Sequence, residues 1–183
     1  MKIALVGTEG TGKTTLAKAV SEKYNIPYVD ECARIISKET GIKVREDNSD
    51  KLYEFQIKCL EMKLKEESKY DEFIADRSTI DNLVYYLRWV ANDKDSELNE
   101  KYCRKCIQNI RTYDKIVLME PKYLSLVKDE IRTGNIWYRE SIHFMLIGVL
   151  EEYVEDYIRM PFVYLEDRVN YIGYLFDKEK KTW

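Results

Sequence analysis

The residues with the most recognisable chemical pattern lie near the N-terminus, directly after an apolar run. Residues 7–14 read Gly-Thr-Glu-Gly-Thr-Gly-Lys-Thr and fit the spacing GxxxxGK[ST]. Glycines let a backbone wrap around phosphate oxygens, and the N–H groups of such a loop attract anions together with the following helix N-terminus. The pattern predicts a nucleoside triphosphate site, with the Lys13 ammonium on the terminal phosphates and the Thr14 hydroxyl on Mg²⁺. The expected nucleotide-binding residues are Gly7, Glu9, Gly10, Thr11, Gly12, Lys13, Thr14 and Thr15.

A second group, Asp76-Arg77-Ser78, follows the apolar run at 73–75. Asp76 is a candidate to hold a water bound to Mg²⁺, and Arg77 is a candidate to clamp the transferred phosphoryl group. Both roles follow from the need to neutralise charge on the phosphate oxygens while donor and acceptor are aligned. The alternative interpretation is an aspartate that caps a helix, followed by a surface arginine.

The acidic pair Asp30-Glu31 follows another short apolar run, and Arg34 lies one helical turn after Glu31. These side chains are expected to share a face over the acceptor, with Glu31 as general base and Arg34 as a substrate ligand. A hydroxyl acceptor has a proton to lose, whereas a phosphate acceptor does not. A working carboxylate here would therefore indicate a nucleoside rather than a nucleotide acceptor. The alternative is an acid favoured at a helix start by the helix dipole.

Two further acceptor ligands are expected on the helix after Asp76. Tyr85 could stack on an acceptor base, and Asp81 could bind a hydroxyl or a ring nitrogen. Aromatic residues at helical spacing are more often part of a core, which is the competing interpretation for Tyr85.

Residues 121–139 are predicted to form a lid over the site. The segment is rich in charge, and Gly134 provides a place to bend. Arg132 and Arg139 are the candidates to meet the phosphates when the lid closes and expels water. The competing interpretation is a set of solvated loop charges.

Alternating strand and helix patterns must position these groups. Five short apolar runs separated by helical periods predict an α/β fold with a five-stranded parallel sheet and helices on both faces. Ligands of such sheets bind at the carboxyl ends of the strands, where the charged groups above lie. The expected strands are 2–6, 27–29, 73–75, 115–119 and 162–165. The expected helices are 13–24, 31–40 ended by Gly41, 49–69, one through Ala91, 97–111, 139–159 closed by Pro161, and a short terminal helix.

Composition restricts the class of protein. The 183 residues suit a single domain over 1–183, and 45% hydrophobic with 34% charged residues is typical of a compact fold. The formal charge of -3, without a run of one sign, gives no reason to expect nucleic acid as a partner. No apolar stretch could span a bilayer and no signal cleavage site is seen, so a cytoplasmic protein is expected. The cysteines, including the lone CxxC at 103–106, are interpreted as packing residues.

Five segments, taken in order, resemble the P-loop AAA-domain kinase-like family, which includes the ribosylnicotinamide kinase domain of the bifunctional NAD-biosynthesis regulator. This resemblance implies the three-layer P-loop NTPase fold of nucleoside and nucleotide kinases with a helical lid, and the use of ATP and Mg²⁺. The segments are 3–20, 29–34, 73–86, 129–140 and 162–168.

Asp76-Arg77-Ser78 also resembles the Glu-Arg-Ser segment of deoxynucleoside kinases and the Asp-Arg segment of thymidylate kinases. Resemblance to the former implies that Glu31 is the general base and that Arg132 and Arg139 are the lid arginines. Resemblance to the fold places residues 165–168 at the adenine loop, where Arg168 would stack on the base. Glu130 replaces the glycine that the regulator has in its lid pattern.

The resulting hypothesis is an ATP- and Mg²⁺-dependent phosphotransferase acting on a nucleoside, nicotinamide riboside or a nucleoside monophosphate such as thymidylate. It would work as a monomer or homodimer without a membrane partner. GTPases are disfavoured because the chain contains no DxxG and no NKxD segment. Two alternatives stay open, namely a regulatory ATPase and a kinase of a polynucleotide end or modified base.

Overall fold

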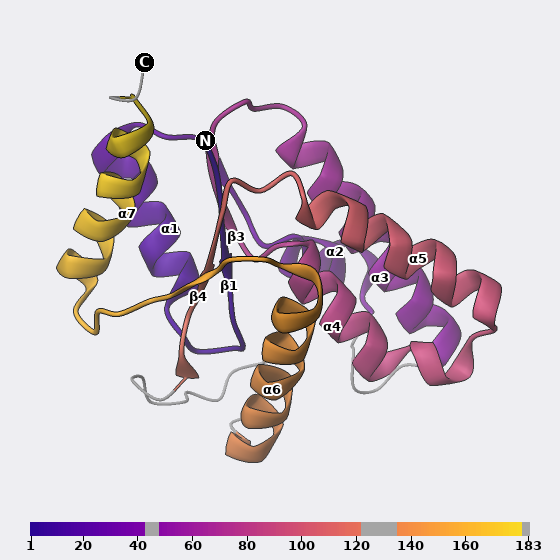
Figure 1. The fold of residues 1–183 in the computed structure, drawn as a ribbon. Coiled ribbons are helices and arrows are strands. Elements are labelled where there is room, and N and C mark those ends of the chain that lie inside the picture. Colours follow the sequence, from indigo (N-terminus) through magenta and orange to yellow (C-terminus); the bar gives the residue numbers. More distant parts are fainter. Residues whose placement is uncertain (43–47, 122–134, 181–183) are drawn as a thin grey trace.

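The computed structural model describes residues 1–42, 48–121 and 135–180 and contains a five-stranded sheet in the order β2-β3-β1-β4-β5 (Figure 1). All four neighbouring pairs are parallel, as the sequence predicted. Because parallel neighbours need long crossovers, helices connect the strands. The strands are β1 Lys2–Val6, β2 Tyr28–Val29, β3 Phe73–Asp76, β4 Lys115–Leu118 and β5 Ile158–Arg159.

Two apolar layers sandwich this sheet. Along β1, Ile3 and Leu5 face one layer while Ala4 and Val6 face the other, which is the alternation expected of a strand buried on both sides. The first layer consists of α1 Lys13–Tyr24 and α7 Leu165–Lys180. The second layer consists of α3 Ser49–Glu67, α4 Thr79–Trp89, α5 Ser96–Ile110 and α6 Ile136–Tyr153.

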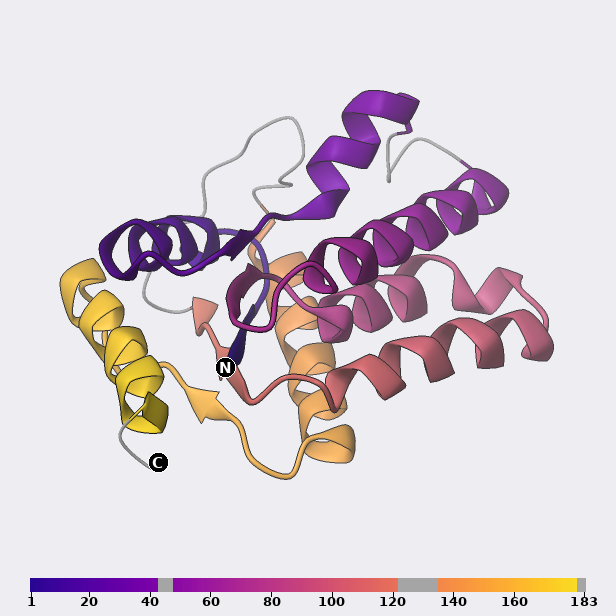
Figure 2. The same ribbon diagram turned by 90° about the horizontal axis from the view of Figure 1, so that it is seen from above.

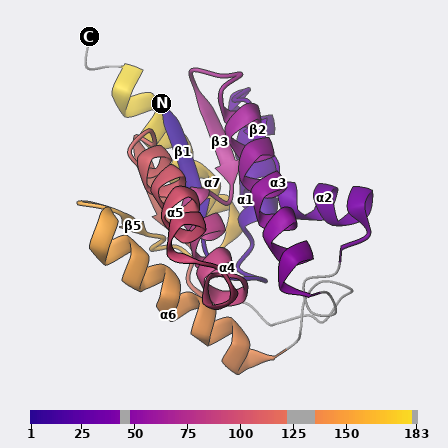
Figure 3. The same cartoon turned by 90° about the vertical axis from the view of Figure 1, so that its right-hand side faces the viewer.

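Figure 2 shows α3, α4 and α5 lying side by side, while α2 Cys32–Thr40 extends away from the sheet beside α3. Figure 3 shows α6 crossing the same layer next to α4. A short 3-10 helix, Ala91–Asp93, joins α4 to α5. The three-layer arrangement confirms the expected α/β fold and leaves the carboxyl ends of the strands open to α2, α3 and α4.

Local sequence explains where several helices begin and end. The Asn48 side chain accepts a hydrogen bond from the Lys51 N–H at the start of α3, and Ser78 forms a reciprocal capping box with Asp81 at the start of α4. Gly41, with φ of 69°, ends α2 as predicted. These signals lie within a few residues of each helix end, which is why most helix boundaries could be predicted closely.

The last strand and the helix before it were predicted wrongly. The apolar helical period continues through Tyr157 and Ile158, but α6 ends at Tyr153 because Val154 takes an extended backbone. Ile158 instead pairs with Val117 in the sheet, and the Met160 N–H donates to the Leu118 carbonyl at 2.9 Å. Periodicity alone cannot separate the last turn of a helix from a short buried strand.

Residues 162–165, predicted as the fifth strand, are exposed and lead into α7, with 76% of Tyr164 accessible. The terminal helix is also not short, since α7 has 16 residues. Its length follows from its packing against α1, where Val169, Ile172 and Phe176 are buried.

The predicted lid lies mainly outside the described residues, which omit 122–134 and therefore Arg132. Of the segment 121–139, the structure describes Pro121, Asn135 as the N-cap of α6, and the first residues of that helix. Among the described helices, none is both long enough and apolar enough to cross a membrane.

Candidate functional site

The glycine-rich loop joins β1 to α1 at the open edge of the sheet. Gly10 and Gly12 have left-handed backbones, with φ of 74° and 85°, and Gly12 is the N-cap of α1. Gly7 has φ of 153°, and a Cβ added there would lie 2.9 Å from the Met119 carbonyl oxygen. Only glycine fits these positions without strain, so the pattern that predicted a phosphate loop also has the backbone such a loop needs.

Replacing Gly7 by alanine should lower the free energy of unfolding by about 1 to 3 kcal/mol, because the new methyl group meets backbone at a positive φ. Gly148 is a matched control, since it lies inside α6 and a Cβ there meets nothing within 4 Å. Gly148→Ala should raise the free energy of unfolding by about 0.5 to 1 kcal/mol. Urea unfolding of both variants tests this, and equal effects would contradict the close approach at Gly7.

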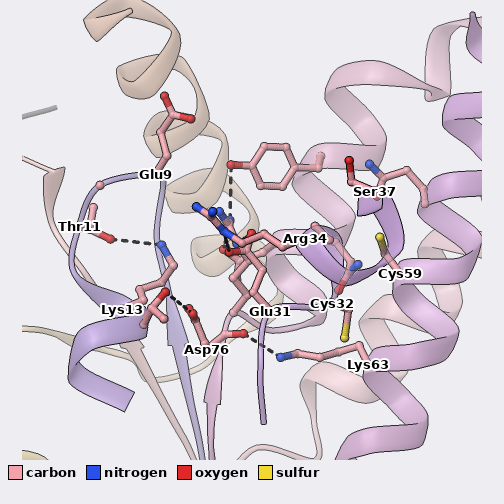
Figure 4. Close-up of a pocket in the computed structure, with 18 of the residues that line it drawn as sticks. Glu9, Thr11, Lys13, Glu31, Cys32, Arg34, Ser37, Cys59, Lys63 and Asp76 are labelled. Carbon is pink, nitrogen blue, oxygen red and sulfur yellow. Dashed lines mark hydrogen bonds and ion pairs between the residues drawn. The ribbon is translucent and has the colours of Figure 1, made fainter. Parts of the chain in front are cut away.

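Lys13 is buried beneath the loop. Its Nζ donates to the Thr8 carbonyl at 2.8 Å and to Thr11 Oγ1 at 3.2 Å. Burial lowers the pKa of Lys13 to about 8, and the neighbouring Arg77 adds to this effect. The ammonium is thus held among oxygens of the loop itself, at the place where an anion enclosed by the loop would meet it (Figure 4).

Thr14 and Asp76 bring two oxygen ligands together. Thr14 Oγ1 donates to Asp76 Oδ2 at 2.5 Å, and Asp76 is fully buried at the end of β3. Its other oxygen, Oδ1, is buried with no hydrogen-bond partner among the described residues. Hydroxyl and carboxylate oxygens are the ligands that Mg²⁺ prefers.

No cluster of three or more His, Cys, Asp or Glu side chains occurs in the described ranges that could hold a metal ion. The two oxygen ligands of Thr14 and Asp76 are the number that Mg²⁺ usually takes from a protein at nucleotide sites, where water and phosphate provide the rest.

Arg77 and Glu31 form an ion pair across the site. Arg77 Nε lies 2.6 Å from Glu31 Oε1, and Arg34 Nε lies 3.5 Å from Glu31 Oε2. Burial by itself would raise the pKa of Glu31, but Arg77, Lys13 and Arg34 together hold that pKa below its ordinary value. Glu31 is therefore ionised at neutral pH. It is also the N-cap of α2, but its side chain makes no capping hydrogen bond.

The backbone of Arg77 is strained. Its φ of 68° is left-handed, which is uncommon for a residue with a side chain and costs about 1 to 3 kcal/mol. This conformation turns the guanidinium into the site, where Nη1 lies 3.4 Å from both Asp81 Oδ1 and the Tyr85 hydroxyl. The Tyr85 ring lies beside the same group, 5.2 Å from its centre.

Asp81 is tied to the loop and to its own helix. Its carboxylate accepts hydrogen bonds from the Ser78 N–H at 2.9 Å and the Gly7 N–H at 3.4 Å. Burial raises the pKa of Asp81, while the charges of Arg77 and Lys13 oppose the rise. Binding of an acceptor by Asp81 stays a prediction, and the described bonds show that it also connects α4 to the phosphate loop.

These groups surround one cavity of about 300 Å³. Its walls combine the loop, the site charges and a set of side chains from α2, α3, α4 and α6 that the sequence had not assigned to a site. Phe55 and Cys59 belong to the apolar core beside the sheet and also line this cavity. The unassigned lining residues are Cys32, Ala33, Ser37, Phe55, Gln56, Cys59, Lys63, Asn82, Trp89 and Tyr138.

The site residues predicted in the loop, apart from Gly7, line this cavity together with those predicted between Glu31 and Tyr85. Gly7 lies against Met119 instead. Two predicted arginines do not line the cavity. Arg168 is buried at the start of α7, where Nη1 donates to the Thr11 carbonyl at 3.3 Å and Nε to the Phe162 carbonyl at 2.8 Å. Arg139 is buried on α6, with Nη2 3.8 Å from Glu140. Their roles toward adenine and phosphate stay predictions.

The pKa of Lys13 predicts how nucleotide binding depends on pH. Since Lys13 loses its proton near pH 8, affinity for ADP should fall about tenfold per pH unit above that value, as binding must then take up a proton. Lys13→Met should bind ADP more weakly and with a flat profile over the same range. Calorimetric titrations from pH 7 to 10 would measure this, and parallel profiles would contradict a lowered pKa.

Residues 2–168 match the family model described as AAA domain. No curated protein matches the chain. Among solved structures, NadR in complex with NR is 19% identical, with a TM-score of 0.68 over 96% of this chain and 50% of that chain. The chain therefore spans about half the length of NadR.

Two further neighbours, which the chain spans over most of their length, have a similar fold. Deoxyadenosine kinase from M. mycoides is 18% identical, with a TM-score of 0.64 over 97% of this chain and 99% of that chain. Thymidylate kinase from Candida albicans is 13% identical, with a TM-score of 0.67 over 98% of this chain and 92% of that chain. With a family match that covers most of its length and a sheet and loop of this kind, the chain belongs to the AAA-domain family and has the three-layer fold of the P-loop nucleoside and nucleotide kinases.

Proposed function

We propose that the protein is an ATP- and Mg²⁺-dependent kinase that phosphorylates a hydroxyl group of a small nucleoside-like acceptor. The observation that carries this proposal is the position of Glu31, an ionised carboxylate in the same cavity as Lys13, Thr14 and Asp76. A phosphate loop alone serves many enzymes, but a carboxylate placed beside it can take the proton of an acceptor hydroxyl.

Thr14 and Asp76 would hold Mg²⁺ together with phosphate oxygens, and the ion would neutralise charge on the transferred group. Lys13 would bind the terminal phosphates of ATP. Arg77, held by Glu31 on one side and near Asp81 on the other, would bind the equatorial phosphate oxygens as the transition state forms.

In the transfer itself, the acceptor oxygen forms a bond to the γ-phosphorus while the bond from that phosphorus to the β,γ-bridging oxygen breaks. The acceptor proton passes to Glu31, and ADP leaves with the electron pair of the broken bond. Glu31 Oε1 is occupied by Arg77 at 2.6 Å, so Oε2, with a looser contact to Arg34, is the oxygen placed to take the proton. In a loose transition state the acceptor hydroxyl loses its proton late, when that proton has become acidic. A weak base such as Glu31, with its lowered pKa, can therefore accept it.

The far wall of the cavity supports a flat, partly polar acceptor. Phe55, Tyr85, Trp89 and Tyr138 contribute aromatic surface, and the indole Nε1 of Trp89 is buried with no hydrogen-bond partner in the part of the chain that is described. An aromatic ring with a polar edge would pack against these aromatic side chains and accept a hydrogen bond from the Trp89 indole. NadR in complex with NR and deoxyadenosine kinase are neighbours whose names agree with such a ligand.

A nucleoside monophosphate is the second candidate acceptor. Arg34 lines the cavity with 46% of its side chain accessible, so an anionic group in the cavity would meet a positively charged side chain there. The similarity to thymidylate kinase agrees with this alternative.

The test is mass spectrometry of products after incubation with ATP, Mg²⁺ and separate nucleosides, nicotinamide riboside, nucleoside monophosphates and short oligonucleotides. We expect one nucleoside-like compound to gain one phosphate, with about 10³-fold less product from the Lys13→Met variant. ATP loss without a phosphorylated acceptor would contradict the proposal and favour a regulatory ATPase. Phosphorylated oligonucleotide would favour a polynucleotide kinase.

A further inference from the structure

Lys63 is a buried lysine that neither the phosphate loop nor the acceptor chemistry explains. It lies in the middle of α3, only 2% of its side chain is accessible, and it lines the floor of the cavity. Its Nζ donates to the backbone carbonyl of Asp76 at 2.9 Å, as Figure 4 shows. Burial of an ammonium group costs much free energy unless hydrogen-bond acceptors and an opposite charge lie next to it.

A polar network behind the site provides those partners. Lys63 Nζ lies 3.9 Å from Glu67 Oε1, which also accepts a hydrogen bond from the Tyr113 hydroxyl at 2.8 Å. Asn109 donates to Glu67 Oε2 at 3.0 Å, and Tyr113 accepts from the Thr79 N–H at 3.2 Å. The network therefore connects α3 to α5 and to the first turn of α4. Among the described residues, Lys63 makes its only hydrogen bond to β3, and the Tyr113 ring also packs edge-on against Phe73 of that strand.

The carbonyl that Lys63 binds belongs to the peptide between Asp76 and Arg77. The N–H of that same peptide donates to the Leu5 carbonyl at 3.0 Å. Both polar groups of the peptide are thus held, one from α3 and one from β1. Directly after it, Arg77 takes its left-handed backbone, and such strain persists only when the surroundings hold it in place.

We propose that Lys63 is a positioning residue for phosphoryl transfer, which holds the peptide between Asp76 and Arg77 so that the Arg77 guanidinium stays against Glu31. This inference rests on the proposed kinase function, because it assigns Lys63 a role in that reaction. Without the Lys63 hydrogen bond, the peptide rotates, Arg77 relaxes to a right-handed backbone, and its side chain leaves the ion pair with Glu31.

The first variant is Lys63→Met, which keeps the length of the side chain and removes the ammonium. We expect kcat to fall about 10²-fold, since a small misplacement of a transition-state group has effects of that size. The KM for ATP should change less than threefold, because the loop and Lys13 are untouched. Lys58→Met is the matched control on the same helix, where an exposed lysine pairs with Glu54, and it should keep wild-type kcat.

Lys63→Met also leaves Glu67 as an unpaired buried carboxylate, so its melting temperature should drop by on the order of 10 °C. A second variant separates stability from positioning. Lys63→Met combined with Glu67→Gln removes both charges and retains an acceptor for Tyr113. We expect this double variant to regain most of the lost melting temperature and none of the lost kcat.

A crystal structure of the double variant completes the test and does not depend on knowing the acceptor. In it, the 2.6 Å contact between Arg77 and Glu31 should be lost and the φ of Arg77 should be negative. Wild-type kcat in the double variant, or an unmoved Arg77, would each overturn the inference. If the wild-type protein phosphorylates no acceptor, the proposed function fails. The position of Arg77 in the crystal structure of the double variant would still show whether Lys63 positions Arg77.

Discussion

Lys13→Met should reduce phosphoryl transfer by about 10³-fold, the size of effect seen when a single buried donor to a transition-state oxygen is removed. The lysine is a charged donor enclosed by the loop, and its Nζ lies within 3.2 Å of two loop oxygens. Methionine has a similar length and suits the buried site, so the fold should be kept while the charge is lost. Steady-state product formation at saturating acceptor measures the effect.

Lys18→Met is the control for this variant, since Lys18 lies on the same helix and is exposed. It should leave kcat unchanged. The melting temperature of Lys13→Met should stay close to that of the wild-type protein. Removal of a desolvated ammonium compensates for the lost hydrogen bond, and the Thr8 carbonyl keeps the Thr11 hydroxyl as a donor at 3.1 Å. Full activity of Lys13→Met would contradict the assignment of residues 7–14 as the phosphate loop and the phosphotransferase proposed for this site.

Glu31→Gln should lower kcat for a hydroxyl acceptor by 10² to 10⁴, roughly the contribution of a general base. Glutamine has the shape of glutamate but cannot take the proton, and it also weakens the hold on Arg77. The KM for ATP should change little, because Glu31 does not belong to the phosphate loop. Glu39→Gln, an exposed acid on the same helix, should leave turnover unchanged.

The same variant decides between the two classes of acceptor. A phosphate acceptor is already ionised and needs no base, so Glu31→Gln should then retain turnover within about tenfold. The pH profile gives an independent readout. Because the pKa of Glu31 lies below its ordinary value, its protonation should not limit wild-type kcat between pH 6 and 8. A wild-type acidic limb centred near pH 7 would contradict Glu31 as an ionised base in the resting enzyme.

Some parts of the site could be predicted from the sequence, whereas others required the tertiary structure. The geometry of the loop at 7–14 could be predicted because it is local, since it depends on the backbone of its own glycines and on contacts within five residues. The positions of Asp76 and Glu31 followed from one rule, that parallel strands present their carboxyl ends at one edge. The ion pair between Arg77 and Glu31 joins residues 46 apart and needed the folded chain.

The sequence alone therefore determined the α/β class, the phosphate loop and the edge at which the chemistry gathers. The tertiary structure decided what periodicity cannot, because an apolar residue looks the same whether it covers a sheet, ends a helix or lines a cavity. Ile158 became a strand residue only through its pairing with β4, and Phe55 became part of the cavity wall only because α3 packs beside α2. No local pattern distinguishes Lys63 from the other lysines of α3, and only its burial against the Asp76 carbonyl places it behind Asp76 and Arg77.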